Sequence, residues 1–89
     1  MKTIIIFDKR SYKWDKDPDF NRVFLKQSFR YLEDLLKIKG YLYLNRVYDC
    51  LGMNWNPDNE NICFRKENGQ AEFSYELTEE NTYRITITQ

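Results

Sequence analysis

The stretch ICFRKENGQAEFSYELTEENTYRITIT, residues 62–88, alternates apolar with polar side chains over much of its length. Alternation with a period of two is typical of strands that bury one face of a sheet. Within this stretch, Asn68-Gly69 is a two-residue turn signal of the type I′ class, which predicts a β-hairpin. A hairpin closed at this turn places Phe64 opposite Phe73, so that the apolar side chains share one face.

A second hairpin is predicted around the three-residue loop Glu79-Glu80-Asn81, because Asn81 tolerates the left-handed conformation that such loops need. This register places Glu76 opposite Arg84, an opposite-charge pair on the polar face. The two hairpins together predict a three-stranded antiparallel meander. The side chains expected on its core face are Ile62, Phe64, Phe73, Tyr75, Leu77, Tyr83, Ile85 and Ile87.

Upstream of the meander, the sequence predicts a helix of about twenty residues between Asp17 and Gly40. Asp17 is a suitable N-cap, Pro18 suits the first helical position, and Gly40 is a suitable C-terminal stop. The apolar side chains follow at helical spacing, which gives the helix one face to cover the sheet. They are Phe20, Phe24, Leu25, Phe29, Leu32, Leu35 and Leu36.

Two shorter elements complete the expected fold. Asn45 is expected to cap a second helix that runs to about Leu51 and ends at Gly52. The run Thr3–Phe7 is a strand candidate that either joins the sheet or pairs with a second copy of the chain. We therefore expect a single domain, residues 1–89, of the α+β class: a long helix and a short second helix packed on an antiparallel β-sheet with a C-terminal three-stranded meander.

The composition excludes several kinds of chemistry. The chain has 14 Lys+Arg, 14 Asp+Glu, two cysteines and no histidine. Histidine is the usual general base near neutral pH and a common metal ligand, so we expect neither an enzyme nor a metal site, and no cofactor. The first apolar run is short and is stopped by Asp8-Lys9-Arg10, so we expect neither a signal peptide nor a membrane span. A cytoplasmic protein with free thiols is expected.

The charge is divided between the two halves of the chain. Residues 1–44 hold ten Lys+Arg and six Asp+Glu, whereas residues 45–89 hold four Lys+Arg and eight Asp+Glu. This +4 and −4 division indicates a polarised surface that suits docking to a protein. The neutral total makes nucleic acid a less favoured partner, since nucleic-acid-binding domains are usually basic.

Three regions carry candidate contact residues, because Tyr, Trp and Arg are the usual anchors of protein interfaces. Residues 9–16 mix basic and aromatic side chains, a pattern also found in single-strand nucleic-acid contacts. Tyr41 and Tyr43 alternate with Leu42 and Leu44, so one of the two pairs is expected to be exposed. Trp55 is either an exposed anchor or a lid on the core. The candidates are Arg10, Tyr12, Lys13, Trp14, Tyr41, Tyr43 and Trp55.

The segment GYLYLNRVYDCLGM, residues 40–53, resembles a segment of small uncharacterised proteins from phages and prophages of Gram-positive bacteria. Those proteins read approximately Gly-Tyr-Val-x-Leu-Asn-x-x-Tyr-x-x-Leu-Gly-Leu. The similarity covers the central third of the chain at residue level and the last third in outline, and the first seventeen residues do not match. The resemblance implies an origin in a mobile element and supplies no catalytic residue.

The leading hypothesis is a small non-enzymatic protein-interaction module of phage or mobile-element origin, working in the cytoplasm of a bacterial host cell. One specific version is an inhibitor of a host defence system such as a CRISPR nuclease. A second copy of the chain is a further candidate partner. The alternative hypothesis is a nucleic-acid-binding accessory protein that uses residues 9–16.

Overall fold

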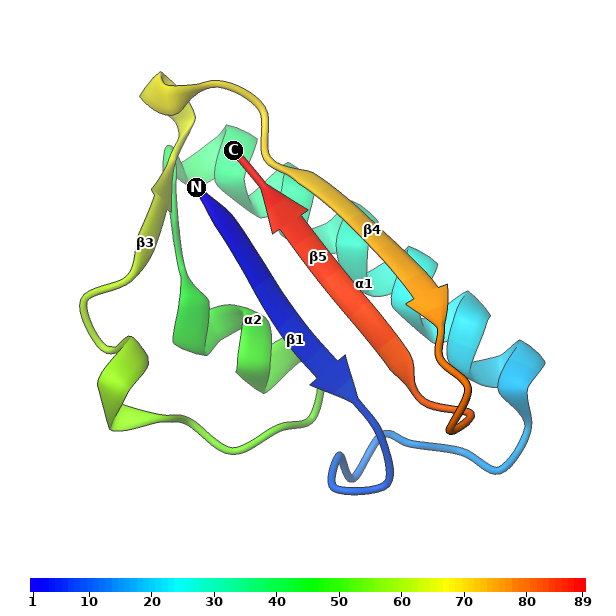
Figure 1. The fold of residues 1–89 in the computed structure, drawn as a ribbon. Helices are drawn as coiled ribbons and strands as arrows, with labels where there is room; N and C mark the ends of the chain where they lie inside the picture. Colours follow the sequence, from blue (N-terminus) through cyan, green and yellow to red (C-terminus); the bar gives the residue numbers. More distant parts are fainter.

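The computed structural model describes residues 1–89 as two layers (Figure 1). One layer is a three-stranded antiparallel sheet in the order β1-β5-β4, and the other contains the helices α1 and α2. A second sheet of two strands, β2 and β3, lies beside them. The bounds are β1 Lys2–Phe7, α1 Pro18–Lys39, β2 Tyr41–Tyr43, α2 Leu44–Cys50, β3 Cys63–Arg65, β4 Glu72–Leu77 and β5 Tyr83–Thr88, with single 3₁₀ turns at Pro57–Asn59 and Lys66–Asn68. The α+β class is therefore confirmed.

Local signals determine both ends of α1, as expected. The Asp17 carboxylate accepts a hydrogen bond from the Asp19 backbone N–H at 2.9 Å, which satisfies one of the free amides of the first turn. At the other end, Gly40 adopts φ +84° and its N–H donates to the Leu36 carbonyl at 2.8 Å. The buried apolar face consists of Leu25, Phe29, Leu32 and Leu36, whereas Phe20, which the helical spacing assigned to this face, is exposed.

The hairpin between β4 and β5 has the expected register. Glu76 lies opposite Arg84, and their side chains form an ion pair at 2.6 Å. Asn81 has φ +62° and is the one residue other than glycine with a positive φ. The amide side chain of asparagine can bond locally to the backbone, which lowers the cost of this conformation. The prediction of this hairpin is confirmed.

Strand β1 joins the same sheet and makes β5 its central strand. Pairing runs from Lys2 opposite Thr88 to Phe7 opposite Tyr83. Met1 and Gln89 extend the ladder with two backbone hydrogen bonds of 2.8 and 3.0 Å, so the first and last residues lie side by side (Figure 1). The buried β1 residues Ile5 and Phe7 face the helices.

The predicted hairpin at Asn68-Gly69 is wrong, and with it the meander formed from residues 62–88. Strand β3 pairs with β2, so that Phe64 lies opposite Leu42 rather than Phe73. A type I′ turn needs positive φ at both central residues, but only Gly69 has it, because Asn68 ends a 3₁₀ turn. The third strand of the main sheet is therefore β1, from the other end of the chain.

The core between the layers contains most of the side chains expected there. Phe64, Tyr83, Ile85 and Ile87 are buried, and Ile62, Phe73 and Tyr75 are partly buried against the core. Leu77 was also expected there, but it is 55% exposed because it lies at the end of an edge strand. Phe7, Leu25, Leu32, Leu42 and Leu51 are the largest of the other core side chains that are fully buried.

A disulfide would test the β2–β3 pairing. Tyr43 lies opposite Cys63, between the ladder hydrogen bonds, a position where Cα atoms are about 4.5 Å apart and within disulfide reach. Tyr43→Cys in a Cys50→Ser background should oxidise to an intramolecular disulfide, measured as protection from alkylation by mass spectrometry. The rejected hairpin would instead place Cys63 opposite Ser74. Protection of Ser74→Cys, and not of Tyr43→Cys, would contradict the observed pairing.

Candidate protein-interaction surface

Strand β2 presents Tyr41 and Tyr43 to solvent. The neighbouring Leu42 and Leu44 are buried in the core, which decides between the two pairs that the sequence left open. The tyrosines are 44% and 45% exposed, and their rings meet edge to face with centroids 5.7 Å apart. This contact limits the motion of both rings, so they form a preorganised contact surface.

Trp55 is also on the surface, with 68% of its area exposed. The loop that carries it is held against α2 by Asn45. The Asn45 amide group donates to the Asn56 carbonyl at 3.2 Å and accepts from the Asn56 N–H at 3.1 Å. Asn45 is therefore not the N-cap that the sequence predicted: the N-cap position is Tyr43, two residues earlier, and α2 has no side-chain cap. Its role is to fix the loop next to Trp55.

An open cavity of about 650 Å³ is lined by both Tyr43 and Trp55. A second depression, of about 200 Å³, adjoins it, because Tyr43 and Arg46 line both. Tyr41 lines the second depression and Trp55 the first. We call the residues Tyr41, Tyr43, Arg46 and Trp55 the aromatic surface.

Arg46 is a member of this surface that the sequence analysis missed. Its Nη2 donates to the Tyr31 hydroxyl at 2.9 Å, and its Nη1 lies 3.7 Å from the Asp49 carboxylate. The hydrogen bond that Arg46 donates to the Tyr31 hydroxyl, with a contribution from the Asp49 carboxylate, raises the pKa of Arg46 above its usual value. Arg46 stands at i,i+3 from Asp49 on one face of α2, a spacing that was readable from the sequence. Its proximity to Tyr31, on α1, was not.

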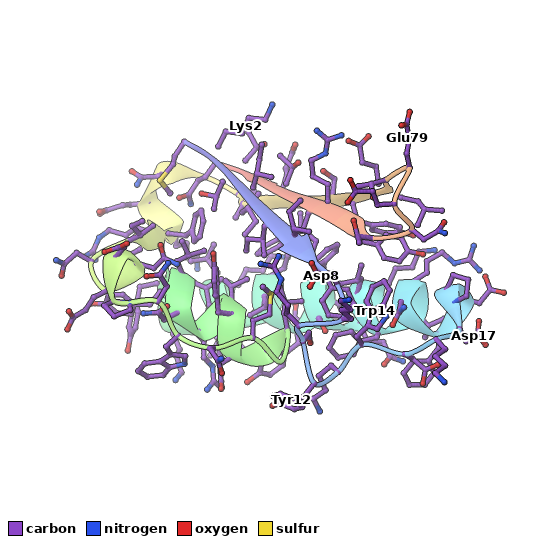
Figure 2. All side chains as sticks on the ribbon, turned by 60° about the horizontal axis from the view of Figure 1, so that its bottom comes forward. Lys2, Asp8, Tyr12, Trp14, Asp17 and Glu79 are labelled. Carbon is purple, nitrogen blue, oxygen red and sulfur yellow. The ribbon has the colours of Figure 1, made fainter.

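The candidates in residues 9–16 lie apart from the aromatic surface and differ among themselves. Arg10 is bound to Asp8 by an ion pair of 3.0 Å, and this hydrogen-bonded contact lowers the pKa of the Asp8 carboxyl. Tyr12 is 76% exposed, with the Lys13 ammonium 5.4 Å from its ring centroid. Trp14 lies between the sheet and the helices, with its ring 5.3 Å from Phe7 (Figure 2). Trp14 is thus mainly a packing residue.

This segment is fixed to the end of α2 by hydrogen bonds. The Ser11 hydroxyl donates to the Leu51 carbonyl at 2.6 Å, and the Tyr12 N–H donates to the Gly52 carbonyl at 3.1 Å. The Asn21 side chain, buried at the start of α1, donates to the Asp15 carbonyl at 2.8 Å and accepts from its N–H at 2.9 Å. The connection from β1 to α1 is therefore held at both ends.

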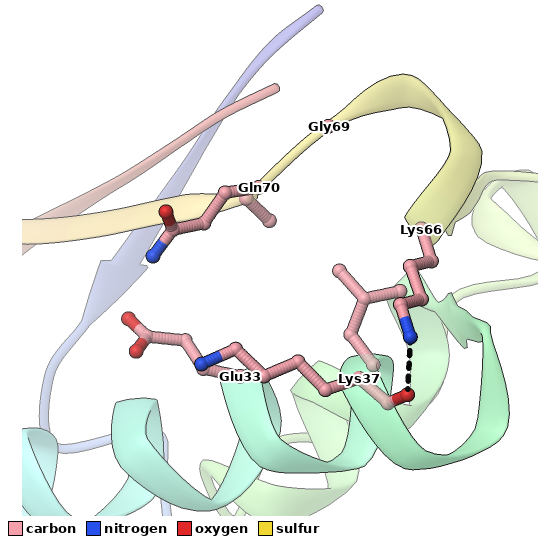
Figure 3. Close-up of a pocket in the computed structure, with 7 residues that line it drawn as sticks. Glu33, Lys37, Lys66, Gly69 and Gln70 are labelled. Atoms are coloured by element: carbon pink, nitrogen blue, oxygen red, sulfur yellow. Dashed lines mark hydrogen bonds between the residues drawn. The ribbon is translucent and has the colours of Figure 1, made fainter.

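A smaller cavity, of about 260 Å³, lies between α1 and the connection from β3 to β4 (Figure 3). Glu33 and Gln70 face each other across its opening (Figure 3). The Lys66 ammonium donates to the Lys37 carbonyl at 3.2 Å, where the last carbonyls of α1 need partners. The main charged contact in this cavity therefore serves to cap the helix.

The remaining polar chemistry is limited. Both cysteines are free and partly buried, and burial raises the pKa of the Cys50 thiol, which keeps it protonated at neutral pH. No group of three or more Cys, Asp or Glu side chains is arranged to hold a metal ion. The arrangement offers exposed aromatic and guanidinium groups for contact.

None of the helices has the length and apolar character needed to span a membrane. Comparison with curated proteins and with solved structures found no match. A family model described as "Family of unknown function (DUF6353)" matches residues 1–88, which is almost the whole chain. The chain therefore belongs to the DUF6353 family.

Proposed function

We propose that this chain is a small non-enzymatic protein-interaction module and that the aromatic surface is its docking site. The observation that carries the proposal is the grouping of exposed Tyr41, Tyr43 and Trp55 around Arg46. Tyr, Trp and Arg are the residue types that dominate binding energy in protein interfaces. A surface with this composition binds by excluding water from a few large side chains.

Preorganisation supports the same proposal. The Asn45–Asn56 hydrogen bonds fix the Trp55 loop, the ring contact orders Tyr41 and Tyr43, and Tyr31 holds Arg46. Ordering interface side chains costs about 0.5–1.5 kcal/mol each on binding, and this arrangement lowers that cost. Such a surface suits a folded partner more than a mobile substrate.

The resemblance of residues 40–53 to phage and prophage proteins supports a mobile-element origin, and the tyrosines and Arg46 fall inside that segment. In the specific version of the proposal, the module occludes a working surface of a host-defence protein such as a CRISPR nuclease. Nucleic-acid binding through residues 9–16 has less support, because Arg10 is paired with Asp8 and Trp14 is packed between the layers.

Alanine substitution on the aromatic surface tests the proposal. Trp55→Ala and Tyr43→Ala should each reduce retention of the host protein that the immobilised wild-type chain captures from lysate of a Gram-positive bacterium. Removing an interface anchor costs about 2 kcal/mol or more, equivalent to about a thirtyfold loss of affinity. Affinity is measured by biolayer interferometry with the captured protein after purification.

Tyr12→Ala is the matched control, because Tyr12 is an equally large exposed aromatic residue outside the aromatic surface. It should leave the affinity unchanged, and circular dichroism should show that all three variants are folded. Equal affinity of Trp55→Ala, Tyr43→Ala and wild type would refute the docking site. Capture of no protein would refute the proposed function itself.

A further inference from the structure

Strand β1 has an unpaired edge. It lies at one side of the main sheet and is bonded on its other side to β5. Met1 and Gln89 exchange both backbone hydrogen bonds, so Thr3, Ile5 and Phe7 point their N–H and C=O groups toward β5. By the same alternation, Lys2, Ile4 and Ile6 point theirs toward the free edge. An edge of this kind is a ready template for another strand.

A groove runs beside this edge. Its volume is about 330 Å³, and it lies between β1 and the residues at and after the end of α2. Ile4, Ile5 and Ile6 line the groove on the β1 side, and Tyr48 and Met53 line it from the residues at and after the end of α2. An extended peptide placed here would bond to the β1 backbone and rest its alternate side chains on apolar atoms. The β1 edge and the adjacent apolar groove together meet the requirements for peptide binding by strand addition.

The charges at the two ends of β1 indicate the occupant. Lys2 is exposed at the start of the strand, and Lys9 and Arg10 follow its end. Arg10 is paired with Asp8, so Lys9 supplies the net positive charge at that end. Arg10 also lines the groove. A peptide that runs in either direction therefore meets a cation at each end. Acidic residues on both sides of an apolar centre would be complementary to this edge.

We infer that the β1 edge binds an extended segment of a protein partner, with β-branched apolar residues at its centre and Asp or Glu at its flanks. The segment adds to the main sheet as a fourth strand. A second copy of this chain fits less well, because antiparallel pairing of two β1 strands brings Lys2 of each copy to the Asp8-Lys9-Arg10 segment of the other. Lysine at a strand edge is a known means of preventing self-pairing.

The test uses the full chain and a displayed library of random peptides about nine residues long, the length of an ordinary strand with its flanks. Selection should enrich peptides with alternating Val, Ile or Thr and acidic ends. In ¹⁵N-resolved hydrogen exchange, the enriched peptide should protect the amides of Ile4 and Ile6, which face the free edge. Ile5 gives the reference, since its amide is already bonded within the sheet.

Proline scanning of the two sheet edges provides the matched comparison. Ile4→Pro removes a donor from the β1 edge without removing a β1–β5 hydrogen bond, whereas Leu77→Pro does the same on the opposite edge, in β4. Ile4→Pro should weaken peptide binding about tenfold, because one backbone hydrogen bond is lost. Leu77→Pro and Ile4→Thr, which keeps the N–H, should bind within about twofold of wild type.

The charge argument is tested separately. Lys2→Glu should weaken binding of the enriched peptide about fivefold at low salt, and the difference should disappear at about 0.5 M salt. The inference is overturned if no peptide is enriched, if enriched peptides lack acidic residues, if they bind Ile4→Pro as well as wild type, or if analytical ultracentrifugation shows that the free chain dimerises through β1. These outcomes do not depend on the aromatic surface, so they leave the proposed function untouched.

Discussion

Phe7→Ala should lower the free energy of unfolding by about 3–5 kcal/mol, the range for truncating a large buried aromatic residue. Phe7 is fully buried, and its ring packs against Trp14 and Phe24 at centroid distances of 5.3 and 5.6 Å. It therefore joins β1, the following connection and α1 in one aromatic cluster. A domain of this length has a total stability of about 4–13 kcal/mol, so the loss removes a large share of it. Urea denaturation measures the change.

Ile4→Ala is the control for Phe7→Ala, because it truncates a side chain on the opposite, exposed face of the same strand. It should cost less than about 1 kcal/mol. Phe7→Leu keeps most of the side-chain volume and should lower the free energy of unfolding by less than about 1.5 kcal/mol. Its stability can therefore be measured even if the alanine variant does not fold. Equal effects of Phe7→Ala and Ile4→Ala would contradict the orientation of β1.

Gly52→Ala should lower the free energy of unfolding by about 2–5 kcal/mol. Gly52 has φ +72°, a conformation that costs an L-residue about 1–2 kcal/mol. An added Cβ would also lie 2.5 Å from Lys13 Cγ and 2.8 Å from Ser11 Oγ, which is closer than packing allows. Relieving that overlap costs about 1–3 kcal/mol more and displaces the Ser11 hydroxyl from Leu51. The thermal midpoint should fall by about 4–8 °C for each kcal/mol.

Gly40→Ala is the control for the backbone contribution alone. Gly40 has φ +84°, but an added Cβ there meets no atom within 4 Å. Its cost should be about 1–2 kcal/mol, from the left-handed conformation alone. The difference between the two variants therefore measures the close approach of residues 11–13 to the end of α2. A difference of zero would show that this approach is not maintained in solution.

The predictions that succeeded depend on residues close together in the sequence. The Asp17 cap, the Gly40 stop and the Asn81 turn each act through hydrogen bonds or φ values within a few residues. The register between β4 and β5 followed from that turn, because a short loop leaves little freedom in pairing. The Asn68-Gly69 turn failed because the same two residues also fit the end of a 3₁₀ turn.

The candidate interaction surface was predictable in part. Tyr41, Tyr43 and Trp55 were identified from residue type, and the structure shows all three exposed. The grouping of these residues with Arg46 was not predictable, because it depends on how the Trp55 loop returns to α2 through Asn45 and Asn56. Trp14 has the same residue type as Trp55, yet it packs between the layers, since its loop passes beside Phe7.

The amino-acid sequence was sufficient to predict the α+β class, the limits of α1, the β4–β5 hairpin and the apolar faces of β3, β4 and β5. These follow from local hydrogen bonds and from periodicity. Three features became known from the three-dimensional fold alone: β1 pairs with β5, β3 pairs with β2, and the β1 edge is open. Alternation of apolar residues shows which side of a strand is buried, but not its neighbour. The choice of neighbour depends on closing loops of tens of residues and filling one core, and no local signal encodes it.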